Sequence, residues 1–319
     1  MDRSGAWIRR HDGTLQASPK RQRLSPAARL RRWLGGHYAP YLYIAPFFVV
    51  FLSFFTYPVA YSFYVSLHRW NGVGPMRYVG SDNYTFVLGD SYWWSAVETT
   101  AVLWLMVIPV GTAISLLLAL AWNRSVFLGR NLSQALFILP AVTSIVATSI
   151  VFRILYDGQF GPIDVLLRAL HVPAVPWLTS DVWSKPAIAI VRLWESVGLF
   201  ALFYSAALQG ISTDIYDAAA VDGCGAIRRL WSITLPLLTR TILFTTMLGT
   251  LAVLGLFAEP QLITGGGPDG SSTNIGLYLY SLLQGLDFGT ASAVSFLMTA
   301  IMIVVSVTIF VIARRWQFD

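Results

Sequence analysis

The stretch Tyr41–Leu67 reads YLYIAPFFVVFLSFFTYPVAYSFYVSL and contains no charged side chain over its 27 residues. A helix needs about 20 apolar residues to cross the hydrocarbon core of a bilayer. The apolar part of a cleavable signal peptide is only about 7–15 residues long. The stretch is therefore predicted to be a membrane-spanning helix rather than a signal peptide. Pro58 is predicted to kink it.

The composition extends this prediction to the rest of the chain. Of the 319 residues, 55% are hydrophobic and only 12% are charged, whereas soluble domains carry about 25% charged residues. Unsatisfied backbone groups in lipid cost several kcal/mol each, so apolar segments of this length are expected to be helices. The fold class is predicted to be all-α integral membrane with six transmembrane helices. After the first, they are expected at residues 101–122, 132–156, 186–208, 237–262 and 289–313.

The basic residues predict the orientation of these helices. Nine of the 22 Lys and Arg residues lie in residues 1–40, which are interpreted as a basic and mostly disordered cytoplasmic tail. With this tail inside, 16 of the 22 fall on the inner side, as the positive-inside rule requires. Both termini are therefore predicted to be cytoplasmic, in a multi-pass protein of the cell membrane. The net charge of +6 does not indicate nucleic acid, because no basic face interleaved with aromatic residues follows the tail.

The residues that carry most metal and enzyme chemistry are sparse. Cys224 is the single cysteine, and the four histidines are scattered, so no metal site is predicted. The chain contains neither a G-x-S-x-G nor an H-E-x-x-H motif. It also lacks a G-x-x-x-x-G-K-[ST] phosphate loop, so any ATP used has to be hydrolysed by another chain. The sequence therefore predicts no catalytic residue, no enzyme and no cofactor bound by this chain.

One inner link, residues 209–240, is long and patterned. Ser212 or Thr213 can cap a helix whose first turn is expected to carry Asp214 and Asp217. The Asp222-Gly223 pair is typical of the left-handed turn that ends a helix. A second short helix is predicted at about 226–234, stopping at Leu235-Pro236. The link is expected to form a compact, protruding pair of helices.

This link resembles the EAA loop of ABC importer permeases. The matching residues in register are Asp217, Ala218, Ala219, Asp222, Gly223, Leu230, Ile233, Leu235 and Pro236. The sequence departs from the family pattern at Asp217, where glutamate is usual, and at Cys224, where alanine is usual. The resemblance implies a MetI-like permease domain at 41–315, whose loop at about 209–236 docks on a separate cytoplasmic ATPase. The alternative interpretation is an ordinary amphipathic link.

A second motif is similar to an outer loop of MalF-like carbohydrate permeases. It is Thr264-Gly265-Gly266-Gly267-Pro268, supported by Leu139-Pro140 and by the run from Tyr156 to Asp164. The resemblance implies a heterodimer with a second, MalG-like permease, two ATP-binding cassette subunits that use ATP and Mg, and an extracytoplasmic solute-binding protein. The motif read alone also fits a flexible turn without a partner.

Polar side chains within the predicted helices mark a candidate sugar path. Membrane-embedded charge is costly and usually faces a bundle interior or a wet cavity. Arg192 and Glu195 are three residues apart and can pair on one helix face, so they are either path residues or an internal ion pair. The candidates for the path are Arg192, Trp194, Glu195, Tyr204, Glu259 and Gln261.

The predicted function is the permease subunit of an ATP-driven carbohydrate importer, which forms half of the translocation pathway. One alternative is a secondary, ion-coupled transporter, for which embedded carboxylates and broken helices are expected in both halves. Another is an ABC importer for a different solute, such as glycerol phosphate.

Overall fold

The computed structural model describes residues 7–9, 15–17, 39–123 and 129–315. The predicted cytoplasmic tail, 1–40, lies mostly outside the described residues. Its described parts are two short strands, β1 (Trp7–Arg9) and β2 (Leu15–Ala17), which pair antiparallel with Ile8 opposite Gln16. The chain divides into two compact units, residues 1–61 and 62–319.

The first predicted span is helical and begins in the first unit. It consists of α2 (Ala39–Phe51), the π-helical turn η1 (Leu52–Thr56) and α3 (Tyr57–Ser66), which ends in the second unit. The Tyr57 N–H bonds to the Leu52 carbonyl, one residue further back than in an α-helix. Such a turn loosens the ladder just before Pro58, which has no N–H to contribute.

Short outer elements and long helices make up the second unit. Strands β3 (His68–Arg69) and β4 (Arg77–Tyr78) pair antiparallel and lead into α4 (Asp82–Gly89). Three long helices match the predicted spans, although α5 begins ten residues earlier than predicted. They are α5 (Ser91–Trp122), α9 (Ser184–Gln209) and α14 (Phe288–Arg315). The short helix α13 (Ile275–Gln284) precedes α14.

The third predicted span is broken, which corrects the expectation of one continuous helix. Helices α6 (Arg130–Val142) and α7 (Ile145–Leu155) meet at 99°. The break falls on Thr143-Ser144, whose hydroxyls compete for backbone partners. The Thr143 hydroxyl donates to the Leu139 carbonyl at 2.8 Å, and Ser144, in extended conformation, begins α7. Among the described residues there are thus five long apolar helices, or six spans if the bent pair counts as one.

The predicted helix stop at Leu235-Pro236 is wrong. Helix α11 (Ala226–Arg229), the π-helical turn η2 (Leu230–Thr234) and α12 (Leu235–Leu254) follow one another without a break. The Leu235 N–H reaches back to the Leu230 carbonyl. The wider turn accommodates Pro236, as η1 does before Pro58, so the chain enters the membrane without ending the helix.

The fifth predicted span also ends earlier than expected. Helix α12 stops at Leu254 with Gly255 as its cap, and a turn leads into the π-helical segment η3 (Pro260–Thr264). The Asn274 side-chain amide donates to the Leu256 carbonyl at 2.5 Å. Residues 255–264 therefore form an irregular segment. Glu259 lies in this segment and not at the end of a straight helix.

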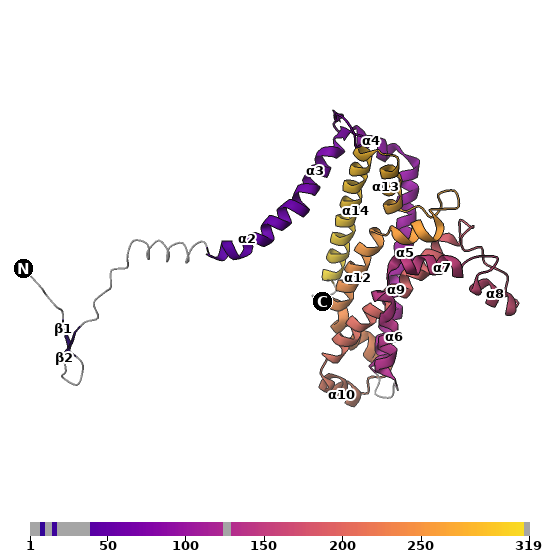
Figure 1. The fold of residues 1–319 in the computed structure, drawn as a ribbon. Helices are drawn as coiled ribbons and strands as arrows, with labels where there is room; N and C mark the ends of the chain where they lie inside the picture. Colours follow the sequence, from indigo (N-terminus) through magenta and orange to yellow (C-terminus); the bar gives the residue numbers. More distant parts are fainter. Residues whose placement is uncertain (1–6, 10–14, 18–38, 124–128, 316–319) are drawn as a thin grey trace, which may run out of the picture. The chain divides into compact units, whose positions relative to one another are not determined.

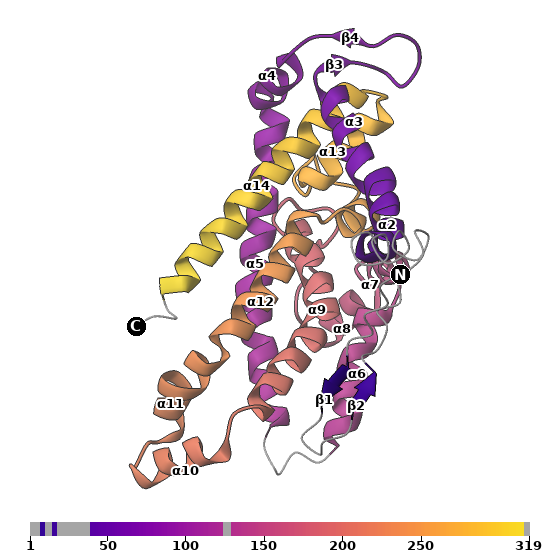
Figure 2. The ribbon, with the colours of Figure 1, turned by 90° about the vertical axis from the view of Figure 1, so that its left-hand side faces the viewer.

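The core of the second unit lies where α5, α9 and α12 pack together. Leu103, Ile188 and Val253, one from each helix, are at most 1% exposed. Small residues allow close approach, as in other membrane helices. At Gly198 the backbone of α9 lies so near α6 that an added Cβ would overlap the Phe137 carbonyl. Figure 1 and Figure 2 show α10 and α11 at one end of this bundle and α4 and α13 at the other.

We predict that Gly198→Ala destabilises the protein, because its methyl group has no space against the Phe137 carbonyl. Overpacking of this kind costs about 1–3 kcal/mol or more. The melting temperature of the detergent-purified protein measures the effect. The matched control is Gly89→Ala in α4, where an added Cβ meets no atom within 4 Å. Equal melting temperatures for the two variants would contradict the close contact between α6 and α9.

Candidate functional site

The patterned link folds into a helical hairpin at one end of the bundle. We define the hairpin as α10 (Thr213–Val221), the turn 222–225 and α11. The predicted cap is confirmed, since the Ser212 hydroxyl accepts the Asp214 N–H at 3.2 Å. Asp214 lies in the first turn of α10, where its charge complements the helix dipole. The placement of Asp217 in the same turn was wrong, because α10 begins at Thr213 and Asp217 lies one residue beyond its first turn.

The predicted left-handed turn is also confirmed. Gly223 has a φ of +73°. The Cys224 N–H donates to the Ala219 carbonyl at 2.8 Å, and the Gly223 N–H donates to the Ala220 carbonyl at 3.1 Å. These two bonds form a Schellman motif, which satisfies the last carbonyls of α10 and needs a left-handed residue at Gly223. The turn therefore has a fixed geometry.

Many residues of the hairpin are exposed on its surface. Asp217, Ala218, Asp222 and Gly223 are exposed, whereas Ala219 is buried. Two apolar side chains that the sequence analysis missed are strongly exposed: Val221 at 88% and Ile227 at 76%. The sequence could have indicated these two residues, because both are aliphatic side chains within a polar link. Two such side chains beside charged ones make the hairpin a candidate surface for contact with another protein.

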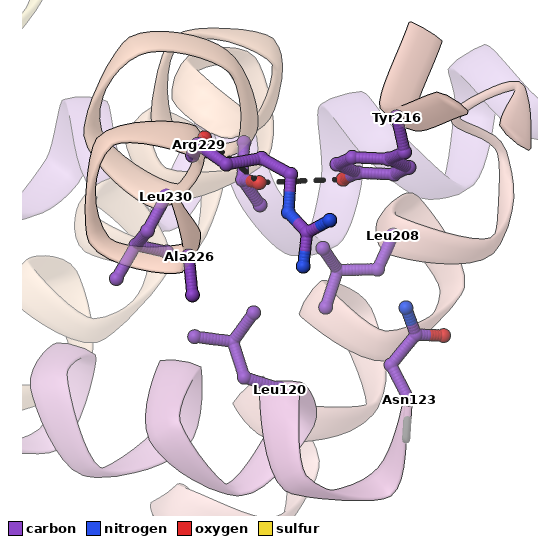
Figure 3. A pocket seen from close by; sticks show the side chains of 8 residues that line it. Leu120, Asn123, Leu208, Tyr216, Ala226, Arg229 and Leu230 are labelled. Atoms are coloured by element: carbon purple, nitrogen blue, oxygen red, sulfur yellow. Dashed lines mark hydrogen bonds between the residues drawn. The ribbon is translucent and has the colours of Figure 1, made fainter. Parts of the chain in front are cut away.

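The inner face of the hairpin is braced against the helix that follows it. The Arg229 guanidinium lies 5.6 Å from the centre of the Tyr216 ring, and the Tyr216 hydroxyl lies 3.3 Å from the Thr234 hydroxyl. These side chains line a cavity of about 390 Å³ between the hairpin and the ends of α5 and α9, and Figure 3 shows Tyr216 and Arg229 beside it. The brace connects α10 to the continuous helix 226–254, so the hairpin and α12 are mechanically linked.

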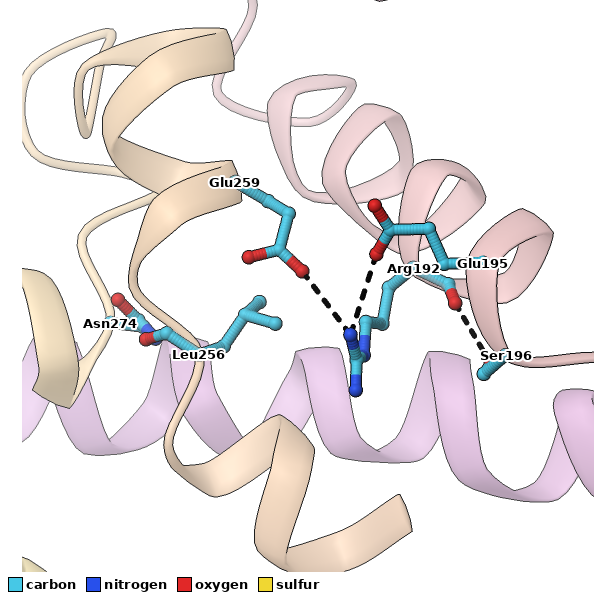
Figure 4. Close-up of polar contacts among 6 residues, drawn as sticks. All are labelled: Arg192, Glu195, Ser196, Leu256, Glu259 and Asn274. Atoms are coloured by element: carbon cyan, nitrogen blue, oxygen red, sulfur yellow. Dashed lines mark hydrogen bonds and ion pairs between the residues drawn. The ribbon is translucent and has the colours of Figure 1, made fainter. Parts of the chain in front are cut away.

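A second group of functional candidates lies between the helices. The predicted pair is present, with Arg192 Nη1 3.4 Å from Glu195 Oε2. The same nitrogen lies 3.6 Å from Glu259 Oε1, and Figure 4 shows the guanidinium between the two carboxylates. The side chains of Arg192, Glu195 and Glu259 are 20%, 8% and 1% exposed. We call these three residues the Arg192 cluster.

The fold explains how the cluster forms. Arg192 and Glu195 are one turn apart on α9, and Glu259 lies on the irregular segment that follows Gly255. Sequence reasoning placed Glu259 near the outer end of a straight helix and so could not bring it to Arg192. The sequence analysis did not predict that α12 ends early, at Leu254.

The structure does not gather the other path candidates at this cluster. Tyr204 lies twelve residues along α9, about 18 Å away, and its hydroxyl lies 2.5 Å from the Thr245 hydroxyl in a buried contact. Trp194 is 44% exposed and meets the Phe152 ring of α7. Gln261 lines a separate outer cavity of about 610 Å³ with Tyr92 and Tyr280.

The sequence analysis missed two buried polar residues of α7. Thr148 and Ser149 are buried, and their hydroxyls find no hydrogen-bond partner among the described residues. Their signal in the sequence was faint, because two hydroxyl residues in an apolar run are common. In the parts of the chain that the structure describes, no three His, Cys, Asp or Glu side chains are grouped as metal ligands.

The comparisons with known proteins agree with this architecture. A family model described as "binding-protein-dependent transport system inner membrane component" matches residues 111–317. The chain belongs to this family of transport permeases and is therefore a multi-pass membrane protein and not an enzyme. Its family works with a binding protein and with further subunits of an ABC transporter.

Curated relatives are similar over most of their length. The lactose transport system permease protein LacF of Rhizobium radiobacter is 32% identical over 281 residues, which cover 86% of this chain and 94% of LacF. The trehalose/maltose transport system permease protein MalF of Thermococcus litoralis is 30% identical over 280 residues, 88% of this chain and 94% of MalF.

Two solved structures share the fold. One chain comes from a bacterial alginate ABC transporter in complex with an alginate pentasaccharide-bound periplasmic protein. It has a TM-score of 0.79 and 23% identity, and the match covers 91% of this chain and 99% of that chain. Another comes from a bacterial ABC transporter involved in import of the acidic polysaccharide alginate, with a TM-score of 0.77, 24% identity and coverage of 90% and 99%.

We predict that the left-handed turn of the hairpin is needed for transport. An added Cβ meets no atom within 4 Å at either Gly223 or Gly225, but φ is +73° at the first and −64° at the second. A side chain in the left-handed region costs about 1–2 kcal/mol. We therefore expect Gly223→Ala to lower transport by the assembled transporter and Gly225→Ala to leave it unchanged. Equal transport by both variants would show that the turn geometry is not required.

Proposed function

We propose that this chain is the permease subunit of an ATP-driven carbohydrate importer, forming half of the translocation pathway. The observation that carries the proposal is the hairpin, a braced and partly apolar projection at one end of a bundle of membrane helices. The family match supports transport, and the relatives named for lactose and for trehalose/maltose support a carbohydrate cargo.

The hairpin is proposed to dock on a separate ATPase through residues 212–236. Asp217, Asp222 and Gly223 are exposed, as are Val221 and Ile227 of the same hairpin, whereas Ala218 and Ala219 are helix-favouring residues within α10. Leu235 and Pro236 continue into α12, so a movement of the hairpin is transmitted to the membrane helix. ATP and Mg are bound by the ATPase in this proposal and not by this chain.

The proposed assembly contains a second, MalG-like permease, two ATP-binding cassette subunits and an extracytoplasmic solute-binding protein. Its support is the family description, which names binding-protein dependence, and the fold neighbour solved with a periplasmic protein. Six spans from one chain are too few to enclose a sugar, which favours a heterodimeric permease. The remaining exposed apolar surface of the helices then faces lipid.

We place both termini in the cytoplasm, with the protein in the cytoplasmic membrane. The hairpin and the end of α5 lie at the same end of the bundle, opposite α4 and α13. That end holds Arg130, Arg228 and Arg229, and the positive-inside rule assigns it to the cytoplasm. An ATPase has to act on that side, so the docking proposal and the orientation support each other.

The substrate path is proposed to pass the Arg192 cluster. Charged groups inside a membrane bundle are conspicuous, and α7, which packs against α9 and η3, carries two further buried hydroxyls, Thr148 and Ser149. Trp194, Tyr204 and Gln261 remain candidates for other positions along the path. Trp194 is the nearest of them in sequence and presents an exposed aromatic face, which suits the C–H side of a sugar ring.

The proposed function is tested by uptake into proteoliposomes that contain the whole transporter. We expect uptake of a neutral sugar that depends on ATP and on the binding protein, and we expect Glu195→Ala to lower it at least about tenfold, a loss of 1.4 kcal/mol. Assembly with the ATPase, measured by co-purification, should be unchanged. The control is Glu98→Ala, which removes an exposed carboxylate of α5.

Two results would contradict these proposals. Uptake driven by an ion gradient without the ATPase would replace the ABC mechanism by secondary transport. Normal uptake kinetics in Glu195→Ala would remove Glu195 from the path and leave the Arg192 cluster as an internal ion pair.

A further inference from the structure

The cavity between the hairpin and the ends of α5 and α9, which we call the hairpin cavity, is open and roomy. Its volume is about 390 Å³, whereas one ordered water needs about 10–15 Å³. Two of its lining residues, Asn123 and Ala226, are exposed, so solvent reaches it from the side that we assign to the cytoplasm. The hairpin cavity therefore has room for a small organic molecule.

The walls of the hairpin cavity combine apolar side chains with one cationic side chain. Leu120 comes from α5, Leu208 from α9 and Leu230 from the start of η2. Figure 3 shows the Arg229 guanidinium pointing into the space that these leucines border. Such a lining suits a ligand with an apolar body and one charged end.

No carboxylate of the described residues matches the charge of Arg229, since both ion pairs in those parts of the chain involve Arg192. The link 124–128, which lies outside the described residues, reads RSVFL and contains no acidic residue. The hairpin itself contains three acidic residues, which are all exposed and unpaired with Arg229: Asp214, Asp217 and Asp222. The hairpin cavity is therefore electropositive.

The helix ends beside the hairpin cavity do not occupy the guanidinium either. Helices α5 and α9 end at Trp122 and Gln209, and helix C-termini attract cations. However, no carbonyl of the described residues accepts a hydrogen bond from the Arg229 side chain, which contacts the Tyr216 ring instead. The ring positions the guanidinium and leaves its N–H groups available to an acceptor.

We propose that the hairpin cavity binds a small organic anion from the cytoplasm. A carboxylate or phosphate group of the ligand accepts hydrogen bonds from Arg229, because the guanidinium fork matches two acceptor oxygens of either group. The apolar body of the ligand lies against Leu120, Leu208 and Leu230. This site is distinct from the Arg192 cluster and so from the proposed path of the cargo.

An anion in the hairpin cavity holds the hairpin at one position relative to the bundle. It contacts Arg229 of the hairpin on one side and Leu120 and Leu208 of the bundle on the other. A ligand stabilises the conformation that it fits best. The anion therefore opposes movement of the hairpin and inhibits transport from the cytoplasmic side. This inhibition rests on the proposed function, whereas the binding does not.

The first experiment measures binding to the purified whole transporter by ¹⁹F NMR. The probes are 4-fluorobenzoate, 4-fluorophenyl phosphate and the uncharged 4-fluorobenzamide. We expect at least one of the two anions to bind saturably and at least about tenfold more tightly than the amide. The tighter of the two distinguishes a carboxylate site from a phosphate site. Equal binding of the amide, or no saturable binding of either anion, overturns the inference and leaves the proposed function standing.

Two variants assign the binding to the hairpin cavity. Arg229→Gln removes the charge and should weaken anion binding at least about tenfold. Leu120→Trp narrows the cavity from α5, keeps Arg229, and decides the question if Arg229→Gln fails to assemble. The matched control is Arg228→Gln, which makes the same charge change at an exposed residue outside the lining and should leave anion binding unchanged. Wild-type affinity in both cavity variants, or an equal loss in Arg228→Gln, overturns the inference.

The second experiment measures ATP-dependent sugar uptake in proteoliposomes, with the bound anion added on the side that contains ATP. We expect the anion to lower uptake by the wild-type transporter at least about twofold. The ratio of uptake with and without the anion should return to one in Leu120→Trp. Binding without any loss of uptake overturns the proposed inhibition. Absence of ATP-dependent uptake even without the anion overturns the proposed function and not the binding site.

Discussion

The requirement that every backbone N–H and C=O be paired inside the membrane governs this structure. Without water as an alternative partner, helix is the default, and each interruption needs a local substitute for the lost bonds. At the bend between α6 and α7, the Thr143 hydroxyl bonds to the Leu139 carbonyl. After Gly255, the Asn274 side-chain amide donates a hydrogen bond to the Leu256 carbonyl. Before Pro58 and Pro236, π-helical turns shift the bonds by one residue.

These interruptions create the functional geometry. The early end of α12 brings Glu259 to Arg192, and the bend at Thr143-Ser144 lets α7 pack against η3 and α9. The ion pair between Arg192 and Glu259 forms because Glu259 lies on the irregular segment after α12 and not in a straight helix. The polar interior therefore depends on irregular backbone, which membrane proteins tolerate only where protein or a wet cavity surrounds it.

Much of the architecture could be predicted from the sequence, for physical reasons. Length and the absence of charge locate the apolar spans, and Ser212 and Asp222-Gly223 predict the ends of α10, because caps act over a few residues. The continuation through Pro236 and the break at Thr143-Ser144 could not be predicted, since each depends on how one turn relaxes. The pairing of Arg192 with Glu195 follows from helical spacing. The addition of Glu259 depends on a tertiary contact that no local pattern encodes.

The absence of a break between α11 and α12 has a mechanical consequence. The helix Ala226–Leu254 has 29 residues, which corresponds to a rod of about 43 Å. Its first turn, α11, is part of the hairpin, and its last residue, Leu254, lies five residues before Glu259. A force applied at the tip of the hairpin is thus transmitted toward the Arg192 cluster by one continuous helix, without a flexible joint between separate helices.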